Sequence, residues 1–259
     1  MPFTLAHPAA VLPLRRLPGL RTAPLVIGAM APDTPDYLPL PHRVGVDAHT
    51  LVGSYVIDLP LGFLLLALAL LLREPLTALL SARARWLCLR ALEPFRRRGS
   101  EWVLAPIAIL IGVWTHLLWD SITHGDGWVV RHVATLRQIV DIAGYDIQVC
   151  HLLQYLSSIV GLAIVLFWYR RLHAPTTDAA HAARLSHAGP GLLLVVGAAL
   201  LIGGVEAQLA YSHSEGAVYR TLDVLLTRSV AWFVLLNLVG GTIVTLEHRA
   251  AAARHDQRQ

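Results

Sequence analysis

Five long apolar runs constrain the fold more than any other feature of this sequence. Each run is close to the roughly 20 residues that an α-helix needs to cross about 30 Å of hydrocarbon. The chain is 55% hydrophobic and 15% charged, whereas a typical soluble domain carries about 25% charged residues. We therefore predict an all-α fold, a polytopic membrane helical bundle with about five transmembrane helices at residues 51–72, 102–122, 152–169, 190–211 and 229–247.

The remaining segments complete a single predicted membrane domain over residues 1–259. Residues 1–50 contain the apolar pieces FTLAHPAAVL and APLVIGAMA, which are too short to span a membrane. We expect them to form short interfacial or re-entrant helices that pack on the spanning helices and contribute ligands. The transmembrane bundle occupies residues 51–247, and residues 248–259 form a solvated tail. The segment 73–101 mixes Leu and Trp with Arg, which predicts an amphipathic segment along the inner surface.

The distribution of arginine predicts the orientation of the bundle. All 21 basic residues are Arg, and we infer no nucleic-acid partner from them. The segment 73–101 holds seven arginines, whereas the connections 123–150 and 212–228 hold two each. Because short Arg-rich loops stay in the cytoplasm, those two connections and the N-terminal region are expected to face outward, away from the cytoplasm. Four arginines of the N-terminal region oppose this orientation: Arg15, Arg16, Arg21 and Arg43.

The stretch THLLWDSITH ends the second apolar run and spaces three ionisable residues four positions apart. On a helix His116, Asp120 and His124 would line one stripe about 12 Å long. Ionisable groups at membrane depth usually face a bundle interior or a wet cavity, and imidazole and carboxylate both bind Zn²⁺ at about 2.0–2.2 Å. One ion cannot reach both ends, so Asp120 is placed to bridge two ions, with His116 on one and His124 on the other. Alternatively, the three side chains lie at headgroup level and bond water or each other.

Four further candidate ligands reach the same outward end in the topology predicted from arginine alone: His7, Asp33, His49 and His151. This agreement favours a shared metal site, because the topology was built without reference to His or Asp. Each residue also has a simpler interpretation. His7 could anchor a surface helix, Asp33 could form a turn or a cap, and His49 could cap the first spanning helix.

Two acidic residues inside apolar runs are expected to serve structure. Asp58 lies nine positions after His49, so on a regular helix the two side chains would point in opposite directions. We expect Asp58 to pair with a polar group on a neighbouring helix rather than with a metal. An Asp58–Arg pair or a Glu206–Arg pair would neutralise such a costly charge.

Several stretches, in order, resemble a bacterial family of multi-spanning membrane proteins of unknown function: MPFTLAHPAAVLPL, PLVIGAMAPD, HTLVGS, IDLPLG and THLLWDSITH. The resemblance covers most of the chain and is strongest over residues 1–155. More distantly, the order of His, the Asp of PD, His and HxxxD is similar to the membrane-bound metal-dependent hydrolases. It is also similar to the zinc-dependent phospholipase C and single-strand nuclease family. That resemblance implies ligand positions at His7, Asp33, His49, His116 and Asp120, and a further ion at His124 and His151.

The chain departs from the soluble zinc family at two points. That family uses its mature N-terminal amine as a ligand, whereas the first His here is His7. It also has a Glu one turn after its last His, where this chain offers Gln154 and Tyr155. We therefore expect one or two Zn²⁺ ions rather than three.

The function predicted from these residues is that of a membrane-embedded, zinc-dependent hydrolase acting on a lipid phosphodiester or ester at the outer membrane face. Asp33 or Asp120 would orient or deprotonate the attacking water, and membrane lipid would supply the surroundings and the substrate. One alternative is a non-enzymatic membrane protein with a structural metal site or an ion-transport role. Another is a haem-binding bundle in which His49, His116 and His151 supply axial nitrogens.

Overall fold

The computed structural model describes residues 4–38, 40–142, 144–172, 190–213 and 218–256, and the rest of the chain lies outside the described residues. Residues 173–189, which lie between the third and fourth predicted spans, and residues 257–259, at the end of the predicted tail, belong to that remainder. The chain forms two compact units. The first comprises Met1–Leu66 and Arg98–Leu172, and the second comprises Ala67–Arg97 and His173–Gln259.

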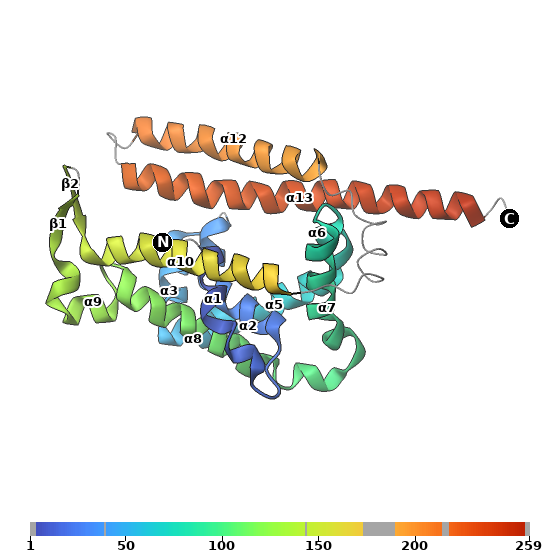
Figure 1. Ribbon diagram of the computed structural model, residues 1–259, viewed down its shortest axis with the longest axis horizontal. Coiled ribbons are helices and arrows are strands. Elements are labelled where there is room, and N and C mark those ends of the chain that lie inside the picture. Colours follow the sequence, from blue (N-terminus) through green and yellow to red (C-terminus); the bar gives the residue numbers. More distant parts are fainter. Residues whose placement is uncertain (1–3, 39, 143, 173–189, 214–217, 257–259) are drawn as a thin grey trace. The chain divides into compact units, whose positions relative to one another are not determined.

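The described residues are almost entirely helical, as predicted (Figure 1). Within the described part of the chain, five helical segments are long and apolar enough to cross a membrane, as expected of an integral membrane protein: Leu51–Leu71, Gly99–His132, Val149–Arg171, Pro190–Tyr211 and Val224–Ala251. The first three contain the elements α4 (Leu51–Gly53), η4 (Ser54–Asp58), α5 (Leu59–Leu71), η5 (Gly99–Trp102), α8 (Ala105–Thr123), α9 (Trp128–His132) and α10 (Val149–Arg171). The last two lie within the longer helices α12 (Pro190–His213) and α13 (Val218–Asp256). The predicted fold class is confirmed.

Short N-terminal helices pack on the spanning helices of the first unit. They are η1 (Thr4–Ala6), α1 (Pro8–Val11), η2 (Leu14–Arg16), α2 (Thr22–Met30), η3 (Thr34–Tyr37) and α3 (His42–Ala48). Helix α2 lies against α8, and their interface buries Leu25, Ala29 and Ala108. A Cβ added to Gly28 would lie 2.1 Å from the carbonyl oxygen of Ile109. Only glycine allows this approach, which brings the end of α2 beside the HxxxD stripe of α8.

A β-hairpin precedes α10 and was not predicted from the sequence (Figure 1). Strands β1 (Ile139–Ile142) and β2 (Tyr145–Gln148) pair antiparallel, with Ile139 opposite Gln148. The turn uses Gly144 at a φ of 85°, in the left-handed region that favours glycine. The strands are short and largely exposed, so they leave only a weak alternating pattern in the sequence.

The second unit pairs α12 with α13, and two shorter helices, α6 (Arg73–Ala78) and α7 (Ala82–Arg97), complete it. Glu206 of α12 accepts a hydrogen bond of 2.9 Å from the indole N–H of Trp232 on α13. It also lies 3.4 Å from Nε of Arg228, so the predicted Glu206–Arg pair forms, but it is not buried, because the two side chains are 35% and 46% exposed. The two contacts neutralise a carboxylate within an otherwise apolar helix pair.

Candidate metal centre

The HxxxD stripe of α8 turns inward. His116 and Asp120 are buried on the face of α8 that contains Gly112 and Val113. Helix α8 ends at Thr123, and His124 is its C-cap residue, so the stripe extends just past the last helical turn. The spacing therefore predicted correctly that His116 and Asp120 share a face. The glycines of HGDGW end the helix at His124.

Four side chains from three separate segments meet at this point. Asp33 precedes η3, His49 ends α3, and His116 and Asp120 lie on α8. One donor atom from each side chain lies within 4.8 Å of the corresponding atom of every other. Nε2 of His49 lies 3.3 Å from Asp33 Oδ1 and 3.5 Å from Asp120 Oδ2. Nε2 of His116 lies 3.4 Å from Asp33 Oδ1 and 3.1 Å from Asp120 Oδ2.

Backbone carbonyls fix the orientation of both imidazoles. Nδ1 of His116 lies 2.8 Å from the carbonyl oxygen of Ala29, and Nδ1 of His49 lies 2.8 Å from that of Gly45. A carbonyl oxygen can only accept, so Nδ1 is the protonated nitrogen that donates in each ring. Nε2 of the neutral ring then presents its lone pair to the cluster. This is the arrangement usual for histidines that bind metals through Nε2.

A hydroxyl group orients the first carboxylate. Thr4 donates a hydrogen bond of 2.5 Å to Oδ2 of Asp33, and the Thr4 hydroxyl also contacts the hydroxyl of Tyr37. The other oxygen, Oδ1, has no hydrogen-bond partner among the described residues and faces the two imidazoles. Thr4 carries a role that the sequence analysis missed, because no recognisable spacing relates it to Asp33.

The ligand atoms of the cluster can bind a cation but cannot hydrogen-bond to one another without added protons. Asp33 Oδ1, His116 Nε2 and both oxygens of Asp120 are buried without a hydrogen-bond partner in the described part of the chain. Carboxylate oxygens and unprotonated imidazole nitrogens are all acceptors, so their convergence is costly unless protons or a metal ion lie between them. Tetrahedral Zn²⁺ with bonds of about 2.0–2.1 Å would space its ligands roughly 3.3 Å apart. The four histidine–aspartate separations, 3.1–3.5 Å, are close to that spacing, and the remaining two pairs of ligand atoms lie within 4.8 Å.

A second group of donors surrounds the other oxygen of Asp120. Oδ1 lies 3.6 Å from Nε2 of His7 and 3.5 Å from Nδ1 of His124. Neither nitrogen has a hydrogen-bond partner among the described residues. The His7 ring stacks on the His116 ring with centroids 3.7 Å apart, and it meets the Trp119 ring edge-on at 5.4 Å. Asp120 thus lies between two histidine pairs, which is the position that the stripe predicted for a bridging carboxylate.

The protonation of the N-terminal ligands follows from burial and from their neighbours. Burial and the adjacent His116 lower the pKa of His7 to about 3, so its ring is neutral. Burial alone would raise the pKa of Asp33, but the imidazoles of His116 and His49 lower it well below its usual value. For His49, burial lowers the pKa and the carboxylate of Asp33 raises it, and the net shift is upward.

Asp58 lacks the polar partner on a neighbouring helix that was expected for it within the described residues. The segment is not one regular helix after His49, because α3 ends there, α4 begins at Leu51, and Ser54–Asp58 form a π-helical turn. Asp58 is fully buried and close enough to His49 and His116 to interact with them electrostatically. Neither of its carboxylate oxygens has a hydrogen-bond partner, and no arginine pairs with it, within the residues that the structure describes. Single π-turns often occur at functional sites.

The remaining predicted ligand, His151, is not one of the four clustered side chains of the described chain. It follows the β-hairpin near the start of α10, and its Nε2 lies 3.8 Å from the point that a Cβ on Gly125 would occupy. This places it near the loop after His124. Its role as a ligand stays a prediction.

Two tryptophans fix neighbouring helices around the cluster. The indole N–H of Trp114 donates to Ser54 Oγ at 3.2 Å, and that of Trp119 donates to Ser157 Oγ at 3.0 Å. The first bond joins α8 to the π-helical turn, and the second joins α8 to α10. Both rings therefore hold the helices that carry the candidate ligands.

The fold and the site together define a class: a polytopic helical membrane protein with a buried histidine and aspartate cluster of metal-ligand composition. The comparison with family models places the chain more closely. Residues 1–246 match the domain of unknown function DUF4184, so the chain belongs to that family. No curated protein and no solved structure matches the chain.

Proposed function

We propose that this protein is a membrane-embedded, metal-dependent hydrolase that acts on a lipid phosphodiester or another lipid ester. One observation carries the proposal. Acceptor atoms from Asp33, His49, His116 and Asp120 converge in a buried cluster at the spacing of metal ligands, with no hydrogen-bond donor of the described chain to satisfy most of them. A protein that needed these residues only for packing would pair them with donors.

The two carboxylate oxygens of Asp120 belong to groups with different numbers of ligand atoms. The group on the Oδ2 side has four ligand atoms, one each from Asp33, His49, His116 and Asp120, which is the complete number for a tetrahedral Zn²⁺. The group on the Oδ1 side has three: Oδ1 itself, Nε2 of His7 and Nδ1 of His124. Catalytic zinc sites typically have three protein ligands and one open position. We therefore assign up to two ions to the site, and the open position to the side of His7 and His124.

The exposure of the ligands leaves one accessible imidazole on each side of Asp120, whereas His7, like Asp33 and His116, is buried. The side chains of Asp33 and His116 are 0% exposed, whereas those of His49 and His124 are 26% and 22% exposed. Substrate would therefore approach at His49 and His124. A bound Zn²⁺ would lower the pKa of water towards 7 and offset negative charge on the substrate oxygens. Asp120, and Asp33 held by Thr4, would orient that water and accept its proton.

The arginine pattern gives the proposed location. Placing the Arg-rich segment 73–101 in the cytoplasm puts the candidate site at the outward face of a bacterial inner membrane. His49 directly precedes the span that begins at Leu51, and His124 follows the last helical turn of α8. The ligands then lie near headgroup level, where the ester and phosphodiester bonds of lipids are found.

Metal analysis of the detergent-purified protein is the first test. We expect one or two equivalents of zinc in the wild type, and loss of metal in His116→Ala and Asp120→Ala. His132→Ala is the matched control, because His132 is exposed and its ring bonds only locally to the carbonyl oxygen of Trp128. Unchanged metal content in the first two variants would contradict the assignment.

Hydrolysis assays on lipid and phosphodiester panels are the second test. The metal-loaded wild type should release product, and the same variants should lose that activity while His132→Ala keeps it. The main alternative is a non-enzymatic membrane protein with a structural metal site, which the complete four-donor set around Asp120 Oδ2 also fits. Full metal content without hydrolysis of any substrate would favour that alternative.

A further inference from the structure

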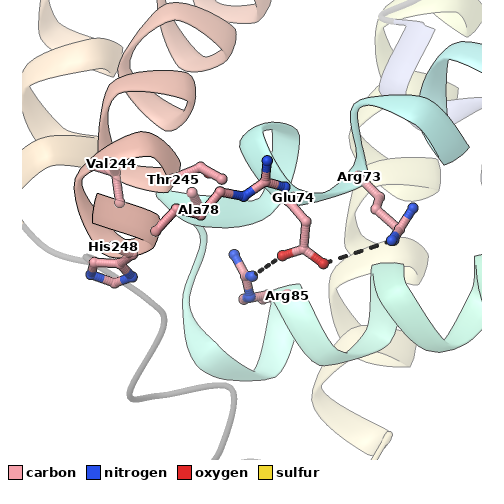
Figure 2. Close-up of a pocket in the computed structure, with 8 residues that line it drawn as sticks. Arg73, Glu74, Ala78, Arg85, Val244, Thr245 and His248 are labelled. Carbon is pink, nitrogen blue, oxygen red and sulfur yellow. Dashed lines mark hydrogen bonds and ion pairs between the residues drawn. The ribbon is translucent and has the colours of Figure 1, made fainter. Parts of the chain in front are cut away.

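A basic pocket lies in the second unit, apart from the residues of the metal centre. It has a volume of about 250 Å³ and lies between α6, the beginning of α7 and the last turns of α13 (Figure 2). Its polar lining comprises Arg73, Glu74, Arg85, Thr245, His248 and Arg249. The proposed hydrolase function uses none of these residues.

The wall of the pocket is built by close contact between α6 and α13. A Cβ on Gly241 would lie 1.9 Å from the carbonyl oxygen of Pro75, so α6 can approach α13 only because this residue is glycine. Nδ2 of Asn237 donates a hydrogen bond of 2.9 Å to the carbonyl oxygen of Leu76. This bond satisfies a backbone group near the end of α6, and it fixes the helix on α13.

The pocket carries a net positive charge, because its arginines outnumber its single carboxylate. Arg85 donates a hydrogen bond of 2.5 Å to Oε2 of Glu74, and Nε of Arg73 lies 3.8 Å from Oε1 (Figure 2). With Arg249, the lining holds three guanidinium groups and one carboxylate, a net charge of +2 from these four side chains. The side chain of Arg85 is only 4% exposed, and its Nε is a buried donor with no hydrogen-bond partner in the described part of the chain. An anion with several acceptor oxygens would complete this set.

The position of the pocket along the chain places it at a membrane surface. Arg73 comes two residues after the span that ends at Leu71. His248 and Arg249 lie near the end of the span Val224–Ala251. Basic pockets between helices at the ends of their spans suit the phosphates of lipid headgroups. Arginine also binds phosphate in a bidentate geometry.

We propose that this pocket binds the phosphate of an anionic phospholipid headgroup. The guanidinium groups of Arg73 and Arg249 contact the phosphate oxygens, and the Nε–H of Arg85 supplies a buried donor. Thr245 contributes no donor, because its hydroxyl donates to the carbonyl oxygen of Gly241 at 2.7 Å. Glu74 competes with the phosphate for the same guanidinium groups.

Native mass spectrometry of the full-length protein in detergent tests this proposal with phosphatidylglycerol and phosphatidylcholine. Phosphatidylglycerol should bind about tenfold more tightly, because each basic residue near a lipid surface contributes about 1 kcal/mol of attraction. The double variant Arg73→Gln/Arg249→Gln should lose that preference. Arg254→Gln is the matched control, because Arg254 is an exposed residue of α13 outside the lining of the pocket. Equal binding of the two lipids by the wild type, or an unchanged preference in the double variant, would overturn the proposal.

A Glu74 variant and a soluble competitor extend the test. Glu74→Gln removes the competing carboxylate and should tighten phosphatidylglycerol binding, an effect that a purely structural Glu74–Arg85 pair would not produce. Inorganic phosphate is the soluble competitor. If phosphate displaces the lipid at a concentration below that at which phosphatidylglycerol binds, the pocket is a site for a free anion. That result would overturn the lipid assignment.

Discussion

Replacing Asp120 by Asn should remove metal from both sides of the cluster at once. Its Oδ2 lies among the nitrogens of His116 and His49, and its Oδ1 lies between those of His7 and His124. The amide has nearly the shape of the carboxylate, but it lacks the negative charge, and its NH2 group cannot bind a metal ion. A protein that binds two zinc ions should therefore lose both.

The magnitude follows from the number of ligands. Structural zinc sites have apparent binding free energies of about 10–16 kcal/mol, or roughly 2.5–4 kcal/mol for each of four ligands. Loss of one charged ligand should then weaken binding by roughly 10²–10³-fold. Because Asp33 contributes only to the side of Oδ2, Asp33→Asn should lose one ion and keep the other.

The assay combines metal analysis with chelator competition on detergent-purified protein. The expected series is two ions in the wild type, one in Asp33→Asn and none in Asp120→Asn after dialysis against a weak chelator. Asp126→Asn is the control, since Asp126 is an exposed residue of the same loop region. The same loss in Asp33→Asn and Asp120→Asn, or full retention in Asp120→Asn, would refute the bridging arrangement.

Three further predictions follow from the same contacts. Because the pKa of His49 is raised, protons should compete with zinc more strongly as the pH falls through that value; chelator competition between pH 5.5 and 8 should show affinity rising with pH, and a flat profile would contradict it. Thr4→Val removes the hydrogen bond to Asp33 and should cost about 10–100-fold in zinc affinity, measured by the same competition. Gly28→Ala forces α2 away from α8, so it should lower the thermal unfolding midpoint and the metal content, whereas Gly197→Ala, with open space around it, should change neither.

The sequence predicted the spanning helices well because crossing the hydrocarbon layer requires a continuous run of about 20 apolar residues, which is visible in the sequence itself. The runs at 51–72 and 190–211 agree with the observed spans Leu51–Leu71 and Pro190–Tyr211 to within a residue. The β-hairpin at Ile139–Gln148 was missed because its short exposed strands impose no such requirement.

The site was predictable in part for a related reason. Spacing alone predicted that His116 and Asp120 share a face, because both lie on one uninterrupted helix. The convergence of Asp33 and His49 on them depends on tertiary contacts between α2 and α8, which no periodicity encodes. The orientation of Asp58 relative to His49 could not be predicted from their spacing, because the break after α3 and the π-helical turn change the rotation between them.

The glycine contact between α2 and α8 also bears on how the protein is made. The carbonyl of Ala29 and the imidazole that it orients are 87 residues apart in the chain. At about 5–20 residues per second, a ribosome needs roughly 4–17 s to synthesise that interval. Throughout this period the nascent N-terminal carboxylate and imidazoles have no partner helix. The four side chains of the proposed metal centre can therefore come together only after the second span has been synthesised, and the order of synthesis sets the order in which the cluster is assembled.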